Sequence, residues 1–224
     1  MRRSETVGEL MQFLQATNWM RLSLLHMAKI VAPLRVLIEL RLKGTGRTKR
    51  AASRRVLTVG DWMPERVEAW DNSREMLMNA VELSFQRPDD CRPLMFPDAR
   101  DLFWGCCLTQ VPKEELVAGL SFMDISHEPL AFLSCVFRGS QLCLPTVDKE
   151  SFAILSAFQR VPYLLWDGSN IFCDHLQPGV HLQSAIVRRN AKQGRVATPC
   201  RVVCMHESVK LRDPAHPRGG QSLG

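Results

Sequence analysis

Hydrophobic positions in the first ninety residues follow the spacing of one-sided helices. Between residues 4 and 20 they recur every three or four positions, which predicts a helix that packs on one face. A second apolar segment, residues 24–40, contains Pro33, and because proline lacks a backbone donor, two short helices are expected there. Pro64 has a fixed φ that suits a helix start, so a third helical segment is predicted over residues 64–85.

The pattern changes after the turn-rich segment 86–93. Two short strands around a turn are predicted in residues 94–110, a third strand in 129–137, an amphipathic helix in 146–161 and a buried strand in 170–174. This order of strands and helix is typical of an α/β unit. Beyond His175 no period is sustained, so residues 176–224 are expected to be disordered.

Composition and charge narrow the class of protein. The chain is 46% hydrophobic and 23% charged, which excludes a disordered chain, a collagen and a disulfide miniprotein. The net charge of +6 comes from the C-terminus, because residues 1–174 carry 21 basic and 21 acidic residues, whereas residues 175–224 carry 8 and 2. Residues 41–55 hold seven Lys and Arg without an acid, so this stretch is either a solvated linker or a loop that contacts phosphates.

The sequence also indicates the compartment. No run approaches the roughly 18 apolar residues of a membrane span, and no apolar core of a signal peptide follows the first arginines. We expect a cytoplasmic or nuclear protein that is not secreted and has no membrane partner. In such reducing compartments the eight cysteines are expected to be buried thiols.

Three acids stand where catalytic groups collect in α/β units. Asp98 lies at the end of the first predicted strand, Glu150 in the first turn of the predicted helix, and Asp174 at the end of the last strand. Three carboxylates brought together at such ends could hold two divalent ions that activate water at a phosphodiester. By composition alone this pattern is weak, because most surface acids are only solvated.

Longer motifs carry a resemblance. The string MFPDARDLFWGCCLTQVP, residues 95–112, and the segment 126–175 resemble the ribonuclease H domain in the polyprotein of gypsy-type LTR retrotransposons. Upstream, FLQATNWMRLSLLHMAKIVAPL resembles the segment that joins the polymerase thumb to that domain. The resemblance covers residues 5–175. It implies that Asp98, Glu150 and Asp174 bind Mg²⁺, or Mn²⁺, and that the domain hydrolyses RNA in RNA/DNA hybrids without a small-molecule cofactor, recognising the hybrid by its shape.

The chain departs from this family in three ways. Arg100 stands where the first motif usually has Ser, which puts a cation near the metal site. A polymerase palm with paired catalytic aspartates is not in this chain. The fourth family acid, in a motif like P-G-E-x-N-x-W-G-D, has no counterpart in residues 176–224 as written. Losing one ligand of a two-metal site is expected to leave slight activity.

A shifted reading frame explains the third departure. Codons compatible with residues 177–184, read one nucleotide on, spell NLAYIFNP, which resembles the family sequence after the D-H motif. The same shift permits KAASQRLAGW from residues 193–203 and LNYVIQHIPGEDNLWG from residues 209–224. The hypothesis is therefore that a single-nucleotide shift near codon 176 made the tail a non-native sequence, with its basic charge a by-product.

Other chemically suggestive residues have simpler interpretations. Cys200, Cys204 and His206 lack a second ligand pair for zinc, and His175 has a structural role at least as readily as a catalytic one. The aromatic and methionine side chains are expected in the core rather than stacked on bases. They are Phe103, Trp104, Trp166, Met11, Met20, Met76 and Met78.

Together these patterns predict an α/β fold. A small helical connection region, residues 1–90 with a basic linker at 41–55, precedes a truncated ribonuclease H-like mixed sheet with helices, residues 91–175, and a disordered basic tail, 176–224. The expected function is that of a retrotransposon reverse transcriptase fragment with a defective nuclease that acts on RNA/DNA hybrids. The alternative is a non-catalytic remnant that at most binds nucleic acid.

Overall fold

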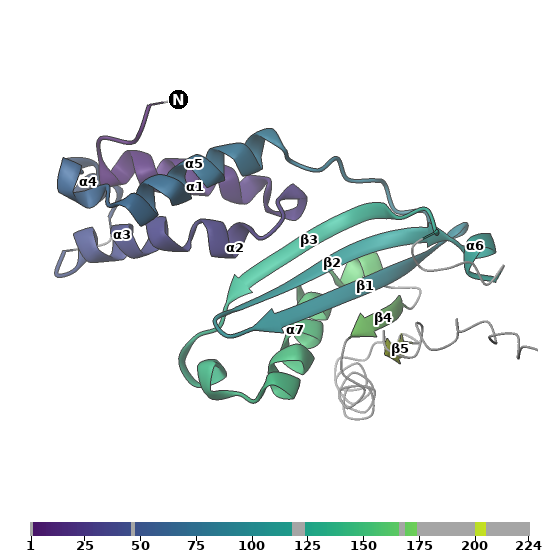
Figure 1. Ribbon diagram of the computed structural model, residues 1–224. Helices are drawn as coiled ribbons and strands as arrows, with labels where there is room; N and C mark the ends of the chain where they lie inside the picture. The colour runs from purple at the N-terminus through teal and green to yellow at the C-terminus, as the bar shows by residue number, and fades with distance from the viewer. Residues whose placement is uncertain (1, 46–47, 118–123, 166–168, 174–199, 205–224) are drawn as a thin grey trace, which may run out of the picture.

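The computed structural model describes residues 2–45, 48–117, 124–165, 169–173 and 200–204, and its chain forms a helical region followed by a sheet with helices (Figure 1). The helices are α1 (Val7–Trp19), α2 (Met27–Ile30), α3 (Ala32–Leu42), α4 (Lys49–Arg54), α5 (Pro64–Met78), α6 (Lys113–Val117) and α7 (Thr146–Arg160). The short 3₁₀ helices are η1 (Arg21–Ser23), η2 (Val59–Asp61), η3 (Gly139–Cys143) and η4 (Pro162–Leu165). The strands are β1 (Cys91–Arg100), β2 (Phe103–Pro112), β3 (Glu128–Val136), β4 (Ser169–Cys173) and β5 (Cys200–Cys204). In the ranges given, no helix is both long and apolar enough to cross a lipid bilayer.

The helices of the helical region begin where the sequence predicts. Helix α1 begins after Thr6, whose side chain accepts a hydrogen bond from the Glu9 backbone N–H. Pro33 lies in the first turn of α3, where its missing donor costs nothing, so the apolar segment forms two helices as predicted. Pro64 opens α5, also as predicted. The helix predictions for residues 4–20, 24–40 and 64–85 are confirmed, with α5 ending at Met78.

The basic stretch 41–55 is ordered in part, which corrects its prediction as a linker without regular structure. Residues Lys49–Arg54 form α4, which Thr48 caps by accepting a hydrogen bond from the Ala51 N–H. Ala52 is buried, and Ser53 lies so close to α1 that a Cβ added at Gly8 would meet its Oγ at 2.9 Å. No hydrophobic period in the sequence predicts this contact between α1 and α4.

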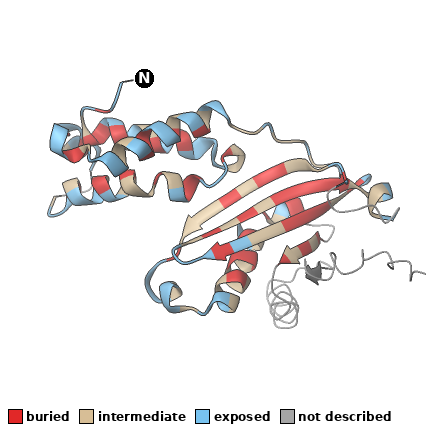
Figure 2. Ribbon diagram, in the orientation of Figure 1, coloured by how far each residue is buried: buried red, intermediate tan, exposed pale blue. Residues whose placement is uncertain are grey.

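The helical region has a core of its own. The burial colouring places its buried residues on the helix faces that turn toward one another (Figure 2). Trp70 of α5 is the largest fully buried side chain in this core, and its ring lies 4.4 Å from the ring of Phe13 and 5.7 Å from that of Trp62. Met76 is buried and Met11 packs against the same core, as predicted. Met20 and Met78 are 45% and 75% exposed, so their prediction as core residues is wrong.

The sheet is mixed and five-stranded, with the order β3-β2-β1-β4-β5. Strands β1, β2 and β3 form an antiparallel meander, while β4 runs parallel to β1 and β5 runs parallel to β4. The strand predictions over 94–110, 129–137 and 170–174 and the helix prediction over 146–161 are confirmed. The predicted α/β fold with a mixed sheet is therefore confirmed.

The two faces of the sheet have different cover. Met95 and Ala99 of β1 share a core with Ala153, Ile154 and Ala157 of α7, so α7 covers this face. Residues of the other parity in β1 pack instead in a smaller cluster with Val111 and Ile125. Side chains in β1 therefore alternate between the α7 core and the opposite face.

Hydrogen bonds from α2 and from the segment after α5 join the helical region to the sheet domain. The Ala28 N–H of α2 donates to Ser134 Oγ of β3 at 2.9 Å. The segment that leaves α5 runs along β3 (Figure 1), where the Ser84 N–H donates to the Pro129 carbonyl at 2.8 Å. Within the helical region, the Val81 N–H donates to the Ser23 carbonyl at 3.0 Å and ties the start of this segment to η1. The two units are thus connected by hydrogen bonds as well as by the chain.

The predicted tail contains one described element. The backbone of β5 pairs with β4 over five positions, from Ser169 with Cys200 to Cys173 with Cys204. The expectation of disorder is therefore wrong for these five residues, since they extend the sheet. The remainder of residues 176–224 lies outside the described residues, and the frameshift hypothesis stays a prediction.

Candidate active site

Asp98 lies near the end of β1 and is exposed to solvent. It pairs across the strands with Gly105 of β2, which in turn pairs with Ser134 of β3. An added Cβ at Gly105 would approach the Leu133 carbonyl oxygen to 3.4 Å, so the position beside Asp98 carries no bulk. The carboxylate therefore stands on an open part of the sheet.

A cavity of about 500 Å³ borders Asp98 on the sheet. The helical region contributes His26 and Lys29, and the first strand contributes Arg100 as well as Asp98. His26 has a left-handed backbone, with φ of 52°, at the start of α2. Lys29 and Arg100 thus share this cavity with two acids, Asp98 and Asp101, and with apolar side chains of the sheet. The sequence pattern missed His26 and Lys29, because a contact across some seventy residues leaves no local signal.

Glu150 is buried, with 8% of its surface exposed. It shares the sheet-facing side of α7 with Ala153, Ile154 and Ala157, at the spacing of one helical face. The sequence predicted Glu150 in the first turn of this helix. Because α7 begins at Thr146, Glu150 lies in the second turn, so that prediction is wrong by one turn. Its carboxylate thus lies against the interior of the domain.

The start of α7 is fixed to the turn between β1 and β2. Lys149 Nζ donates a hydrogen bond to the Asp101 carbonyl oxygen at 2.9 Å, and it lies 5.5 Å from the centre of the Phe137 ring. Asp101 has a positive φ of 42°, which the tight turn requires. These contacts hold the helix that carries Glu150 at the end of β1 that carries Asp98.

The strand alternation separates the two described acids by face. Asp98 has the parity of Phe96, away from the α7 core, whereas Glu150 projects from α7 on the other face. Among the described residues, no group of three His, Cys, Asp or Glu lies close enough to hold a metal ion. Asp174, the third predicted ligand, directly follows β4 and lies outside the described residues.

The donor set suits the implied ion in its chemistry. Carboxylate oxygens are hard ligands, which Mg²⁺ prefers, and no thiol or imidazole is needed. Asp98 and Glu150, with Asp174, would hold the ions. Bound ions would lower the pKa of water and stabilise charge at a phosphodiester. Arg100, exposed two residues after Asp98 and on the same face, adds a positive charge that competes with a cation there.

The remaining predicted residues divide between core and undescribed positions. Trp104 is 3% exposed and belongs to the α7 core, so its prediction as a core residue is confirmed. Phe103 is half-buried at the start of β2. Trp166, His175 and His206 lie outside the described residues, as do the side chains of Cys200 and Cys204.

The thiols at the centre of the sheet resist ionisation. Burial strongly raises the pKa of Cys106, and burial raises the pKa of its neighbour Cys107 to about 11. Cys91 is also buried and its pKa is raised by the loss of solvent. All six cysteines whose side chains are described are free thiols. Cys91, Cys106 and Cys173 are buried, as predicted, whereas Cys143 is exposed, so the prediction of buried thiols is wrong for it.

Comparison with known proteins identifies the sheet domain. Residues 92–198 match the family model described as the RNase H-like domain found in reverse transcriptase. This part of the chain is an RNase H-like domain of the reverse transcriptase kind. The match continues past residue 175, where the sequence pattern had placed the end of this domain.

Solved structures share the fold over nearly the whole chain. The foamy viral protease-reverse transcriptase in complex with dsDNA has a TM-score of 0.63 at 13% identity, and the match covers 91% of this chain and 39% of that one. A foamy viral protease-reverse transcriptase dRH in complex with dsDNA has a TM-score of 0.60 at 13% identity, and the match covers 91% of this chain and 33% of that one. The foamy viral protease-reverse transcriptase in complex with an RNA/DNA hybrid has a TM-score of 0.59 at 16% identity, and the match covers 95% of this chain and 24% of that one.

These matches include the helical region as well as the RNase H-like domain, because they cover more than nine tenths of this chain. The chain spans only 24% to 39% of the length of those proteins. No curated protein matches the sequence.

Proposed function

We propose that the chain is part of a reverse transcriptase of a gypsy-type LTR retrotransposon and that its RNase H-like domain binds RNA/DNA hybrids and cleaves their RNA strand weakly. The observation that carries this proposal is the family match over residues 92–198, which contains Asp98, Glu150 and Asp174 in the order of the family motifs. The solved relatives with this fold include one bound to an RNA/DNA hybrid and two bound to dsDNA.

In this proposal each acid has a distinct position. Asp98 supplies a carboxylate from the exposed end of β1, and Glu150 supplies one from α7, which the Lys149–Asp101 bond anchors at that end. β4 runs parallel to β1, so Cys173, the last residue of β4, lies toward the same end of the sheet as Asp98. Asp174 would therefore complete the set with Mg²⁺ or Mn²⁺ bound.

Two features favour weak cleavage. Arg100 brings a guanidinium to the face that carries Asp98, and a fixed positive charge opposes a second divalent ion. The sequence of residues 176–224 also lacks the fourth family acid. A two-metal site with one ligand fewer holds one of its ions less tightly, so turnover falls by orders of magnitude.

Hydrolysis of a labelled RNA/DNA hybrid in Mg²⁺ tests the enzyme. Asp98→Asn and Glu150→Gln should abolish the residual cleavage. Asp148→Asn is the matched control, because Asp148 is an exposed acid on the same helix as Glu150 and does not line the cavity beside Asp98. Equal rates for the wild type and Asp98→Asn would reject the nuclease.

A non-catalytic role in nucleic-acid binding is the second candidate. Helix α4 and its flanks present an exposed basic surface, whose members are Lys43, Lys49, Arg50, Arg54 and Arg55. Such a surface binds phosphates by releasing counterions, so affinity should fall steeply with salt. Salt-sensitive binding to a hybrid that Mg²⁺ leaves unchanged, without cleavage, would favour this role. Sequencing the transcript through codons 170–224 tests the shifted frame separately.

A further inference from the structure

Four arginines gather where the helical region meets the edge strand β3. They are Arg21 of η1, Arg35 of α3, Arg138 just after β3, and Arg160 at the end of α7. A cavity of about 650 Å³ is lined by Arg35 and Arg138, and a second of about 500 Å³ by Arg21, Arg35 and Arg160. Arg35 borders both cavities, so it is the centre of this group.

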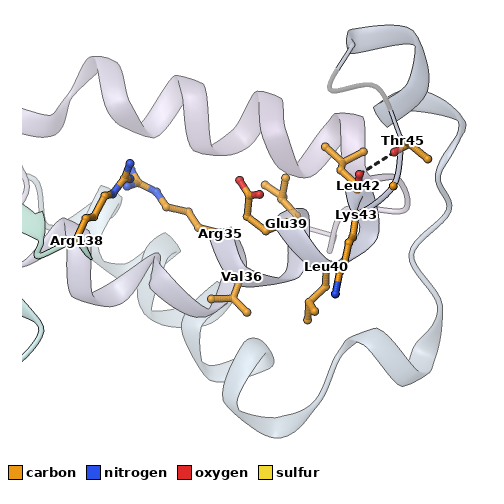
Figure 3. Close-up of a pocket in the computed structure, with 10 residues that line it drawn as sticks. Arg35, Val36, Glu39, Leu40, Leu42, Lys43, Thr45 and Arg138 are labelled. Carbon is orange, nitrogen blue, oxygen red and sulfur yellow. Dashed lines mark hydrogen bonds between the residues drawn. The ribbon is translucent and has the colours of Figure 1, made fainter. Parts of the chain in front are cut away.

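Arg35 and Arg138 come from different units of the protein and extend toward one another (Figure 3). Burial lowers the pKa of the Arg35 guanidinium, the thiol of Cys135 opposes this shift, and the like charge of Arg138 adds to it. Two cations brought together across an interface repel each other, particularly when one is half-buried. Such an arrangement is stabilised when an anion lies between them.

Among the described residues, no carboxylate forms an ion pair with these arginines, in contrast to Arg41 with Asp61 and Arg87 with Glu128. Glu39 also lines the larger cavity, but the groups that shift the pKa of Arg35 are Cys135 and Arg138. The positive charge at this junction is therefore left for a ligand.

Arg160 is already held in place beside this group. Its Nη2 donates a hydrogen bond to Cys135 Sγ at 3.2 Å, and its guanidinium lies 4.9 Å from the centre of the Trp104 ring. The aromatic face and the sulfur fix the planar group while leaving it exposed. A fixed guanidinium loses little conformational freedom when it binds a ligand.

We propose that Arg35, Arg138 and Arg160 form a phosphate-binding site at this junction. Planar guanidinium groups bind phosphate oxygens through paired hydrogen bonds, and the partial burial of Arg35 strengthens the bonds that it makes. The site lies on the edge strand, two strands from β1, or about 10 Å across the sheet from the strand that carries Asp98. The phosphate is that of a nucleic-acid backbone or a free phosphate compound. The first source rests on the proposed function.

Thermal unfolding with inorganic pyrophosphate tests the site without any nuclease assay. Pyrophosphate should raise the Tm of the wild type, and the Arg35→Gln/Arg138→Gln double variant should lose this shift. Arg2→Gln/Arg3→Gln removes the same charge from exposed positions near the N-terminus, outside the α4 surface and both cavities, and should keep the shift. No shift in the wild type, or an equal shift in both double variants, would overturn the site.

Binding of a labelled RNA/DNA hybrid identifies the source of the phosphate. If the backbone is the ligand, the Arg35→Gln/Arg138→Gln variant should bind roughly tenfold more weakly, and its salt dependence should fall by about one phosphate contact. Unchanged hybrid binding together with a lost pyrophosphate shift would assign the site to free phosphate compounds. Wild-type protein that binds pyrophosphate but no hybrid would reject the proposed function and leave the phosphate site standing.

Discussion

Arg41 at the end of α3 donates hydrogen bonds from Nε and Nη2 to the carboxylate of Asp61 in η2, with 2.7 Å between Nε and Oδ1. Asp61 also accepts from the backbone N–H of Thr58 at 2.8 Å and from its hydroxyl at 3.0 Å. The bond from Arg41 is the main cause that lowers the pKa of Asp61 to about 2. Asp61, which is only 7% exposed, thus bonds the segment between α3 and α5 to the end of α3.

The Asp61 pair should make the stability of the protein depend on pH. Because its folded pKa lies below the usual 3.8, the stabilisation is fully present above pH 3.8 and is lost as the pH falls through about 2. Asp61→Asn should lower the free energy of unfolding at pH 7 by about 2 kcal/mol. Urea unfolding should show this difference shrinking between pH 4 and pH 2. Asp71→Asn, an exposed acid near Arg74, is the control and should change little.

Gly8→Ala should destabilise the helical region. The new Cβ would lie 2.9 Å from Ser53 Oγ and 3.0 Å from Ser53 Cα, so α1 and α4 must separate. We expect a loss of about 1–3 kcal/mol, which thermal unfolding measures. At Gly60 the nearest atom to an added Cβ is Thr58 Oγ1 at 3.9 Å, so Gly60→Ala should be tolerated. An unchanged Tm for Gly8→Ala would contradict the packing of α4 on α1.

Ser134→Ala should loosen the junction between the two units. It removes the acceptor of the Ala28 N–H, and a partly buried donor without a partner costs about 1–2 kcal/mol. Hydrogen exchange of the Ala28 amide should accelerate, while amides inside α7 stay protected. Ser156→Ala, on a half-buried position of α7, should leave Ala28 exchange unchanged.

The cysteines should react in an order set by burial. Cys143 is exposed, whereas burial raises the pKa of Cys107 to about 11 and raises the pKa of Cys106 further. At pH 8 the raised pKa values leave little thiolate at Cys107 and less at Cys106. Iodoacetamide followed by peptide mass spectrometry should therefore label Cys143 first and Cys106 last. Labelling of Cys106 as fast as Cys143 in folded protein would show that the sheet is open.

The regular elements could be predicted because their signals are local. The period of α1, the prolines that begin α3 and α5, and the alternation in β1 to β3 all lie within single segments. Helix α4 could not be predicted, since Ala52 is buried by a neighbour some forty-five residues away. The prediction of Met20 and Met78 as core residues is wrong because they lie at the C-terminal ends of α1 and α5, where the helix no longer packs them against the core.

The elements that carry Asp98 and Glu150 were predictable, whereas the arrangement of these acids was less so. Motif spacing placed Asp98 and Glu150 on β1 and α7, as the structure does. The face to which Asp98 turns depends on the parity of β1 relative to α7, which only the assembled sheet fixes. The arginines at the junction come from four separate elements, so no sequence window contains them.

The way β4 enters the sheet also has a consequence for synthesis of the protein. β1 meets β4 at only two residue pairs, whereas β1 and β2 are joined by a tight turn and β3 follows β2 directly in the order of strands. Local contacts form early and distant parallel ones late, so the three-stranded meander forms while β1 still presents an unpaired edge. Until residues 169–173 leave the ribosome, that edge is open to strands of other chains, and slow translation between α7 and β4 should favour aggregation.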